Sequence, residues 1–211
     1  MATMTKILIA GVVVVLVAIA GLFLWQTYLK KPEAAPVTLP EEVKPVQTTD
    51  TYASSTLGIS ITYPKGYTVN EAYAYDQVSP TKLIHGVKFV VPETAFAGTN
   101  LSVSDTGVSI EWLPRAKKCT GDIYLPGNVV ALSFADGGTA YSVATSSGAA
   151  AGNFYEEKVY AIASSSPCTA VRYFLHSSNI GNYATGTAHE FDRAALLSDF
   201  DKIRQSLKIS R

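Results

Sequence analysis

The sequence predicts an α+β protein in which an N-terminal transmembrane helix precedes an antiparallel sheet packed with a few helices. Three observations support this fold class. An unbroken apolar run extends from Ile7 to Trp25, short alternating runs recur from residue 59 onward, and an apolar stripe of helical period lies near the C-terminus. These patterns indicate location and fold, because no recognisable catalytic motif accompanies them.

The apolar run is long enough to cross a bilayer as one helix. Its nineteen residues would span roughly 28 Å at about 1.5 Å per residue, close to the ~30 Å thickness of the hydrocarbon core. Lys6 precedes the run, Trp25 and Tyr28 lie at its end, and Lys30 follows, as is typical of interfacial anchoring. We therefore expect a single-pass anchor in the lipid bilayer at residues 7–29, after a short N-terminal segment of residues 1–6.

Three alternatives explain the apolar run less well. A cleaved secretory signal has a shorter apolar core and a small-x-small cleavage site, which residues 26–29 do not offer. A lipoprotein signal needs a cysteine near the end of the run, and both cysteines lie far downstream. A buried core helix disagrees with the four consecutive valines at residues 12–15, which suit lipid better than a helix in water.

The cysteines indicate the orientation, because the positive charges that flank the run are nearly balanced. Cys119 and Cys168 are an even pair, which is compatible with one disulfide in an oxidising compartment. We therefore expect a cell-membrane protein with a cytoplasmic N-terminus and an extracytoplasmic C-terminal domain. Two unrelated buried thiols are the alternative.

A proline-rich stalk and one globular domain are expected after the anchor. Residues 30–51 carry prolines every four or five residues among Glu, Thr and Val, a composition that favours extended polyproline II and builds no core. Residues 52–211 are enough for one domain with its own core. The whole chain has a formal net charge of +0 and no basic stripe, so nucleic acid is not an expected partner.

Alternation of apolar and small polar residues predicts half-buried strands in the domain. Asp136-Gly137-Gly138 separates two of the alternating runs and predicts a hairpin. The expected strands cover residues 59–63, 87–91, 108–112, 129–134, 140–145, 154–162 and 169–176.

The C-terminal segment predicts the domain's clearest helix. Leu196, Phe200, Ile203 and Leu207 recur at spacings of three and four, so they form one apolar stripe that should pack on the sheet. The charged residues between them lie off the stripe and are expected to be solvated: Asp199, Asp201, Lys202 and Arg204.

The two ends of the domain resemble a known family. A strand closes with YPKGY at residues 63–67, and the last helix leads into SLKI at residues 206–209. Both patterns look like extracytoplasmic domains of the PsbP-like fold, which occur in bacterial membrane-anchored proteins and in the photosynthetic extrinsic subunit. The resemblance implies an α/β/α-type sandwich around an antiparallel sheet and a non-enzymatic binding role.

Patterns typical of catalytic, metal or cofactor sites are missing from the sequence. His85, His176 and His189 have no partner ligand at regular metal spacing. The chain has no GxSxG, SxxK or glycine-rich phosphate loop. We therefore predict no metal site, no cofactor and no assigned catalytic residue.

The best candidate for ligand binding is the loop that follows the last long strand. His176 ends the strand, and Asn179, Asn182 and Tyr183 follow in a glycine-rich loop that could present amide and phenol groups to a sugar or peptide. The alternative is that these side chains satisfy the loop's own backbone through Asx turns. Asn100-Leu101-Ser102 also fits a glycosylation sequon.

The sequence therefore predicts a non-catalytic binding or assembly module, held at the membrane, with an envelope protein or glycan as partner. One alternative is an anchored envelope hydrolase whose site is assembled from distant residues, with His176 as the base. Another is a subunit of a larger membrane complex.

Overall fold

The structure is a computed structural model that describes residues 48–210. The predicted anchor at residues 7–29 and the stalk up to residue 47 lie outside the described residues. Among residues 48–210, no helix combines the length and apolar character needed to span a bilayer. The first strand begins at Thr49, so the ordered domain starts slightly before the expected Tyr52.

An antiparallel sheet dominates the described residues, as predicted. Its strands run in the order β3-β5-β6-β10-β9-β8-β7, and β4 pairs with β5 outside this path. A smaller sheet has the order β1-β2-β11. The strands of the main sheet are β3 (Thr68–Asn70), β4 (Ala74–Tyr75), β5 (Ile84–Val90), β6 (Gly107–Leu113), β7 (Leu132–Asp136), β8 (Thr139–Ala150), β9 (Asn153–Ile162) and β10 (Cys168–Ser178). Those of the smaller sheet are β1 (Thr49–Ser54), β2 (Ile59–Pro64) and β11 (Lys208–Ile209).

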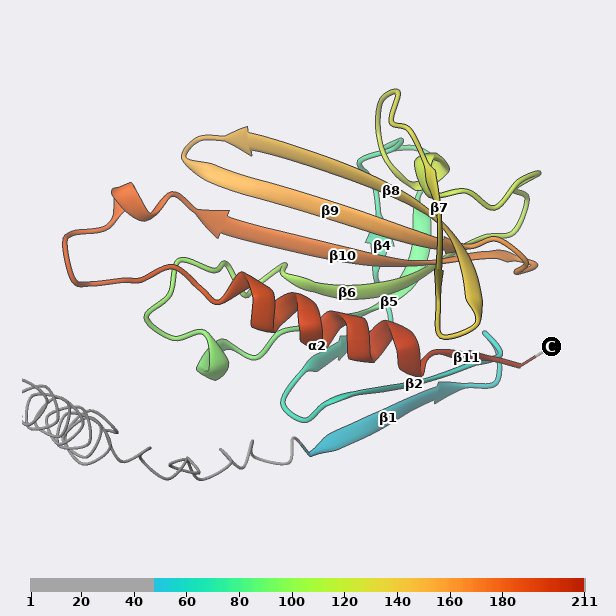
Figure 1. Cartoon of the computed structure of the whole chain (residues 1–211), viewed down its shortest axis with the longest axis horizontal. Coiled ribbons are helices and arrows are strands. Elements are labelled where there is room, and N and C mark those ends of the chain that lie inside the picture. Colours follow the sequence, from blue (N-terminus) through green and yellow to red (C-terminus); the bar gives the residue numbers. More distant parts are fainter. Residues whose placement is uncertain (1–47, 211) are drawn as a thin grey trace, which may run out of the picture. The chain divides into compact units, whose positions relative to one another are not determined.

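One face of the main sheet carries the larger apolar core. The helix α2 (Arg193–Ser206) and the small sheet cover this face (Figure 1). Alternate residues of the central strands point to it and meet the apolar stripe of α2. The core residues include Ile61, Phe89, Val108, Ile110, Val171, Tyr173, Leu196, Phe200 and Ile203.

The opposite face is covered without an α-helix. The short 3-10 helix η3 (Gly121–Tyr124) and β4 pack there around Tyr75, Tyr124 and Val159. The remaining short helices are η2 (Glu93–Ala95) and η4 (Ile180–Asn182). The expected α/β/α arrangement with a few helices is therefore wrong for residues 48–210, where α2 is the single α-helix. The reason is that this face presents charged side chains, on which an apolar helical stripe would not pack.

The predicted disulfide and hairpin are both confirmed. Cys119 and Cys168 are bonded, with their Cα atoms 5.1 Å apart, and the bond ties the segment before η3 to the start of β10. Gly137 and Gly138 turn β7 into β8 with φ values of 55° and 80°, a left-handed conformation that glycine adopts without strain.

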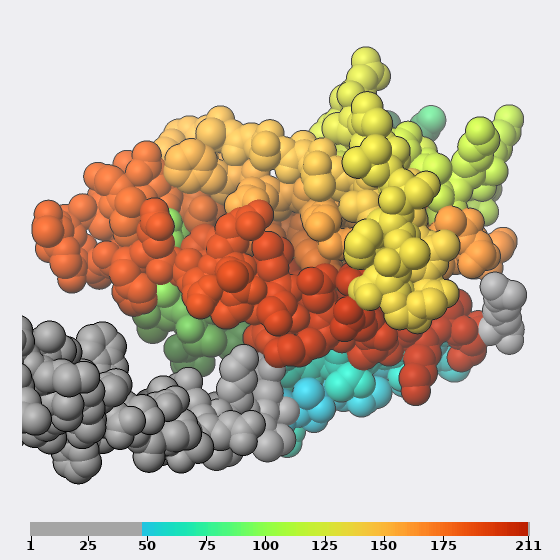
Figure 2. Space-filling model, viewed as in Figure 1, coloured from blue at the N-terminus to red at the C-terminus, as the bar shows by residue number. Residues whose placement is uncertain are grey.

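The prediction that Arg204 is solvated is wrong. Arg204 is 2% exposed, donates from Nε to the Tyr173 hydroxyl at 2.9 Å and from Nη2 to Asp136 at 2.6 Å. Asp136 belongs to the β7–β8 hairpin, which lies over the C-terminal end of α2 (Figure 2). The guanidinium is buried because this hairpin, distant in sequence, covers it.

Asn100 is a structural residue in the folded domain. It is 7% exposed, donates from Nδ2 to the Ser178 carbonyl at 2.8 Å, and accepts from the Phe191 amide at 3.1 Å. The sequon at residues 100–102 is therefore not accessible in the folded state.

Candidate functional site

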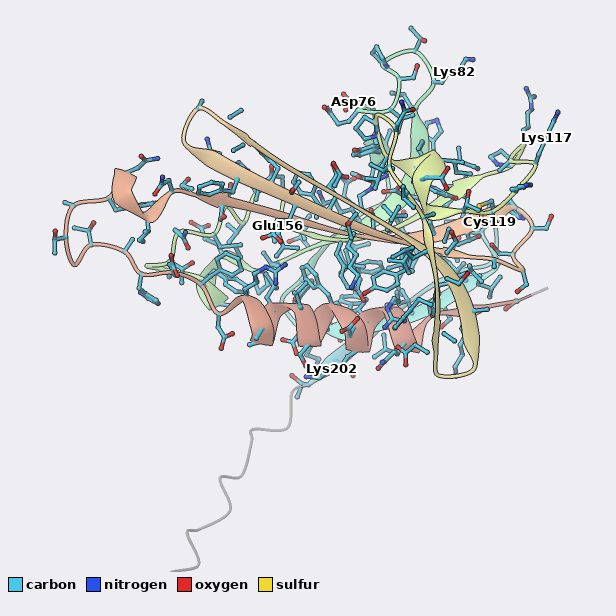
Figure 3. The ribbon with its side chains drawn as sticks, turned by 45° about the horizontal axis from the view of Figure 1, so that its top comes forward. Asp76, Lys82, Lys117, Cys119, Glu156 and Lys202 are labelled. Atoms are coloured by element: carbon cyan, nitrogen blue, oxygen red, sulfur yellow. A yellow bond between two sulfur atoms is a disulfide. The ribbon has the colours of Figure 1, made fainter. Side chains whose placement is uncertain are left out.

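The candidate site lies on the face of the main sheet opposite α2. Because side chains alternate along a strand, this face receives Lys88 from β5, Ser109 from β6 and Arg172 from β10, which are cross-strand neighbours. The next row along the strands contains Phe174, Glu157 and Ser146. Asp76, just after β4, and Lys202 of α2 lie on opposite sides of the sheet (Figure 3).

Arg172 is the centre of a buried charge network on this face. Its side chain is fully buried, and Nε and Nη2 donate to the two Glu111 oxygens at 2.7 and 2.8 Å. Nη1 donates to Glu157, and Nη2 also donates to the Tyr124 carbonyl at 2.7 Å. The guanidinium carbon lies 3.5 Å from the centre of the Tyr75 ring. This pairing of both carboxylates is the condition under which buried charges are tolerated.

Lys88 is buried beside this network but has no such pairing. It is 7% exposed, and its ammonium lies 5.2 and 4.9 Å from the ring centres of Tyr73 and Phe174. The ammonium makes no hydrogen bond or ion pair with any residue of the described range. Burial lowers the pKa of Lys88 from its ordinary value, although the carboxylates of Asp105, Glu111 and Glu157 act in the opposite direction. An ammonium has three donors, and here none of them is used within the described domain.

A pocket of about 540 Å³ opens above Lys88, within the usual range for small-molecule sites. Three parts of the chain form its walls. They are β4 and the residues that follow it, the adjoining ends of β8 and β9, and the loop residues Asp105 and Pro126. The lining residues are Tyr73, Ala74, Tyr75, Asp76, Gln77, Lys88, Asp105, Pro126, Ser146, Ser147, Gly148, Tyr155, Glu157 and Phe174.

His176 supports one wall of the pocket from behind. Its Nδ1 lies 2.9 Å from both carboxylate oxygens of Asp105, and its ring stacks on Tyr155 at 4.5 Å. Asp105 and Tyr155 both line the pocket. The Nε2 atom of His176 is buried and has no hydrogen-bond partner in the described domain. His176 therefore positions two lining residues without facing the pocket itself.

The other three predicted site residues lie on the loop beyond β10, away from this pocket. Asn179 accepts from the Gly181 amide at 2.9 Å, and Asn182 donates to the Gly152 carbonyl at 3.2 Å. Tyr183 is 39% exposed. The two asparagines thus satisfy loop backbone groups, as in the Asx-turn alternative, and their contact with a ligand stays a prediction.

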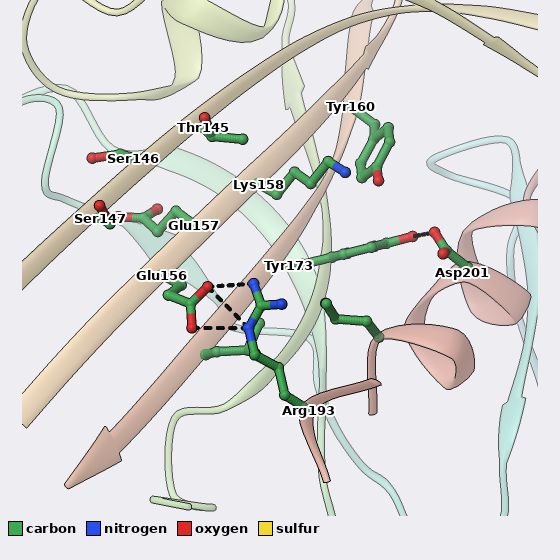
Figure 4. Close-up of a pocket in the computed structure, with 12 residues that line it drawn as sticks. Thr145, Ser146, Ser147, Glu156, Glu157, Lys158, Tyr160, Tyr173, Arg193 and Asp201 are labelled. Carbon is green, nitrogen blue, oxygen red and sulfur yellow. Dashed lines mark hydrogen bonds and ion pairs between the residues drawn. The ribbon is translucent and has the colours of Figure 1, made fainter. Parts of the chain in front are cut away.

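A second pocket, of about 440 Å³, lies between β9, β10 and α2 (Figure 4). Its charged groups are paired or exposed. Arg193 binds Glu156 with Nη2 and Oε2 2.5 Å apart, and Asp201 accepts from the Tyr173 hydroxyl at 2.8 Å. Lys158 is exposed, with its ammonium 5.0 Å from the centre of the Tyr160 ring. This pocket therefore contains no buried charge that lacks a partner, and its ion pair joins α2 to the sheet.

The sequence patterns did not point to three residues of this face: Lys88, Glu111 and Arg172. Each of them interrupts an apolar strand, as in GVKFV around Lys88 and AVRYF around Arg172. A charge between apolar neighbours in a central strand is the signal that could have identified them, because such a strand is buried on both faces.

Comparison with known proteins shows that this chain is similar in fold to a solved structure. No protein-family model matches this chain, and no curated protein matches it. Among solved structures, the chain is similar to cyanobacterial PsbP (CyanoP) from Synechocystis sp. PCC 6803, with 14% identity over 83% of this chain and 99% of that chain and a TM-score of 0.41. The match concerns the fold alone and carries no residue role to this chain.

Proposed function

We propose that this protein is a membrane-anchored, extracytoplasmic binding module that holds its ligand in the pocket above Lys88. The observation that supports this function is the Lys88 side chain, which is largely buried and lines a 540 Å³ pocket, and whose ammonium has no hydrogen-bonding or ionic partner in the described domain. A charge at the wall of a partly enclosed pocket is less well solvated than one on the open surface, so a ligand that pairs with it gains a stronger interaction. Pockets of this kind are the default binding-site hypothesis in a fold without a catalytic motif.

The anchor and the orientation are part of the same proposal. The apolar run from Ile7 to Trp25 supports a membrane span. The Cys119–Cys168 disulfide supports an oxidising compartment, where such bonds persist. Together they favour a domain displayed outside the cytoplasm, within reach of an envelope protein or glycan.

The second candidate function is an anchored hydrolase, favoured by the contact between Asp105 and His176. A base of this type needs a nucleophile or a water at its other ring nitrogen. Nε2 of His176 is buried, and the described domain supplies it with no hydrogen-bond partner. Because the base has no route to a substrate in this arrangement, we propose binding in preference to hydrolysis.

Filling the pocket tests the proposed function. A Cβ added at Gly148 meets no atom within 4 Å, and Gly148 lines the pocket, so Gly148→Trp should occlude it without disturbing the strand. We expect the purified full chain, held in detergent micelles, to be retained on envelope material from the source cells that has been stripped of lipid with the same detergent, and Gly148→Trp to reduce retention to background. Retention is measured by co-sedimentation.

Ala149→Trp is the matched control, because neighbouring residues of a strand point to opposite faces and Ala149 is exposed. It should be retained like the wild type. Equal retention of all three proteins would exclude this pocket as the binding site. On intact source cells, added protease should remove a C-terminal tag from the full chain, and a protected tag would contradict the orientation.

A further inference from the structure

The charged side chains that line the pocket differ in whether they have a hydrogen-bonding or ionic partner. Asp105 contacts His176, Glu157 accepts from the Tyr75 hydroxyl at 3.0 Å and from Arg172, and Asp76 accepts from Gln77 at 2.5 Å. Only the cation, Lys88, has no hydrogen-bonding or ionic partner among the residues of the described domain. Among the charges that line the pocket, three carboxylates and one ammonium, the ammonium is therefore the group left for an anionic group of a ligand to pair with.

The residues that line the walls of the pocket indicate the chemical character of the rest of the ligand, beyond its anionic group. Tyr73, Tyr155 and Phe174 provide ring faces, and aromatic faces pack against flat, weakly polar rings. Ser146 lines the pocket in the same cross-strand row as Glu157, and its hydroxyl makes no hydrogen bond to other residues of the described domain. A purely apolar acid would leave this hydroxyl without a partner, whereas a polyhydroxylated ring would pair with it.

We propose that the pocket binds an acidic saccharide, a sugar ring that bears a carboxylate, with the carboxylate on the Lys88 ammonium. This inference rests on the proposed function and names the ligand class for the same pocket. The ring lies against Tyr155 or Phe174, and one of its hydroxyls pairs with Ser146. A charge-assisted hydrogen bond to the pocket-lining ammonium supplies much of the affinity.

Calorimetry of the full chain in detergent micelles tests this ligand class. The probe is trigalacturonic acid, and its fully methyl-esterified form is the matched compound with the same rings and no charge. We expect the acid to bind and the ester to bind at least tenfold more weakly. Lys88→Met keeps an apolar stem of similar length. It should also lower the affinity for the acid at least tenfold and leave the affinity for the ester unchanged.

Lys158→Met is the control variant, because Lys158 also lies beside a tyrosine ring but is exposed and faces the other side of the sheet. It should bind the acid like the wild type. If Lys88→Met does not fold, judged by its near-ultraviolet circular dichroism, Gly148→Trp replaces it and should abolish binding of the acid.

Three results would overturn the inference. They are equal affinity for acid and ester, no binding of the acid at all, and competition by hexametaphosphate as effective as by the acid, which would indicate a general anion site. None of them decides the proposed function, because the effect of Gly148→Trp on envelope retention is independent of the saccharide used.

Discussion

Arg172→Met is expected to lower the free energy of unfolding by about 3–5 kcal/mol, the usual cost of removing one member of a buried ion pair. Arg172 is the hydrogen-bonding partner of Glu111 on two oxygens and of Glu157 on one. Glu111 is 0% exposed, so after the substitution its charge would have Ser109 as its remaining side-chain donor. Urea unfolding of the full chain, followed by circular dichroism, measures the change.

Arg193→Met is the matched control for this prediction. The Arg193 side chain is 55% exposed and that of its partner Glu156 is 39% exposed, and solvent-exposed pairs contribute only about 0–1 kcal/mol. If Arg172→Met lowers the free energy of unfolding as little as Arg193→Met does, the ion pairs of Arg172 on the pocket face are not shielded from water.

Removing the disulfide is expected to have an effect of similar size. Cys119 and Cys168 are 49 residues apart, and the chain-entropy model assigns about 4 kcal/mol to closing a loop of this length. The Cys119→Ala/Cys168→Ala double variant should therefore unfold at a much lower urea concentration, with the wild type in reductant behaving in the same way.

Thiol alkylation under denaturing conditions provides the control. The untreated wild type should show no reactive thiol, and two should appear after reduction. Two alkylated thiols without reductant would contradict both the disulfide and the oxidising compartment inferred from it.

The sequence was sufficient to predict the strands that carry a clear alternation. Residues 59–63, 87–91 and 108–112 lie within or overlap β2, β5 and β6, because one of their faces packs into the core beneath α2. β7 begins at Leu132 instead of the expected residue 129. β1 gave no signal, because it is an edge strand with no fully buried residue, and burial is what produces alternation.

The opposite face could not be predicted in the same way. Its covering consists of η3 and β4, whose contacts with β10 depend on pairings far apart in the sequence, such as Arg172 with the Tyr124 carbonyl. Arg204 shows the same limit, because a helical pattern alone does not reveal that the β7–β8 hairpin covers one of its charged residues.

The candidate site was predicted only indirectly. His176 is adjacent to the pocket through Asp105 and Tyr155, whereas Asn179, Asn182 and Tyr183 lie on the following loop. The asparagine-rich loop attracted attention because its residue types are common in binding loops. Lys88 did not, since its importance comes from cross-strand neighbours that a single strand does not reveal.

Stability and ligand affinity are both expected to depend on pH through the protonation of Lys88. Burial lowers the pKa of Lys88 below the ordinary 10.5, so between the two values the unfolded chain binds more protons than the folded one. Stability associated with this group therefore rises with pH in that interval. A bound carboxylate favours the charged form and raises the pKa again, so affinity for an acidic ligand should fall as pH rises through the pKa of Lys88.

Carbon-13 NMR of the Lys88 Cε atom, in the full chain labelled at lysine and assigned with Lys88→Met, tests the central claim most directly. The groups that face Lys88 are Tyr73, Asp105, Glu111, Glu157 and Arg172, and together with burial they predict a titration midpoint below 10.5. The midpoint should move upward when trigalacturonic acid is added. A Lys88 resonance that titrates at the ordinary lysine value and does not respond to the acid would contradict a buried, ligand-binding ammonium.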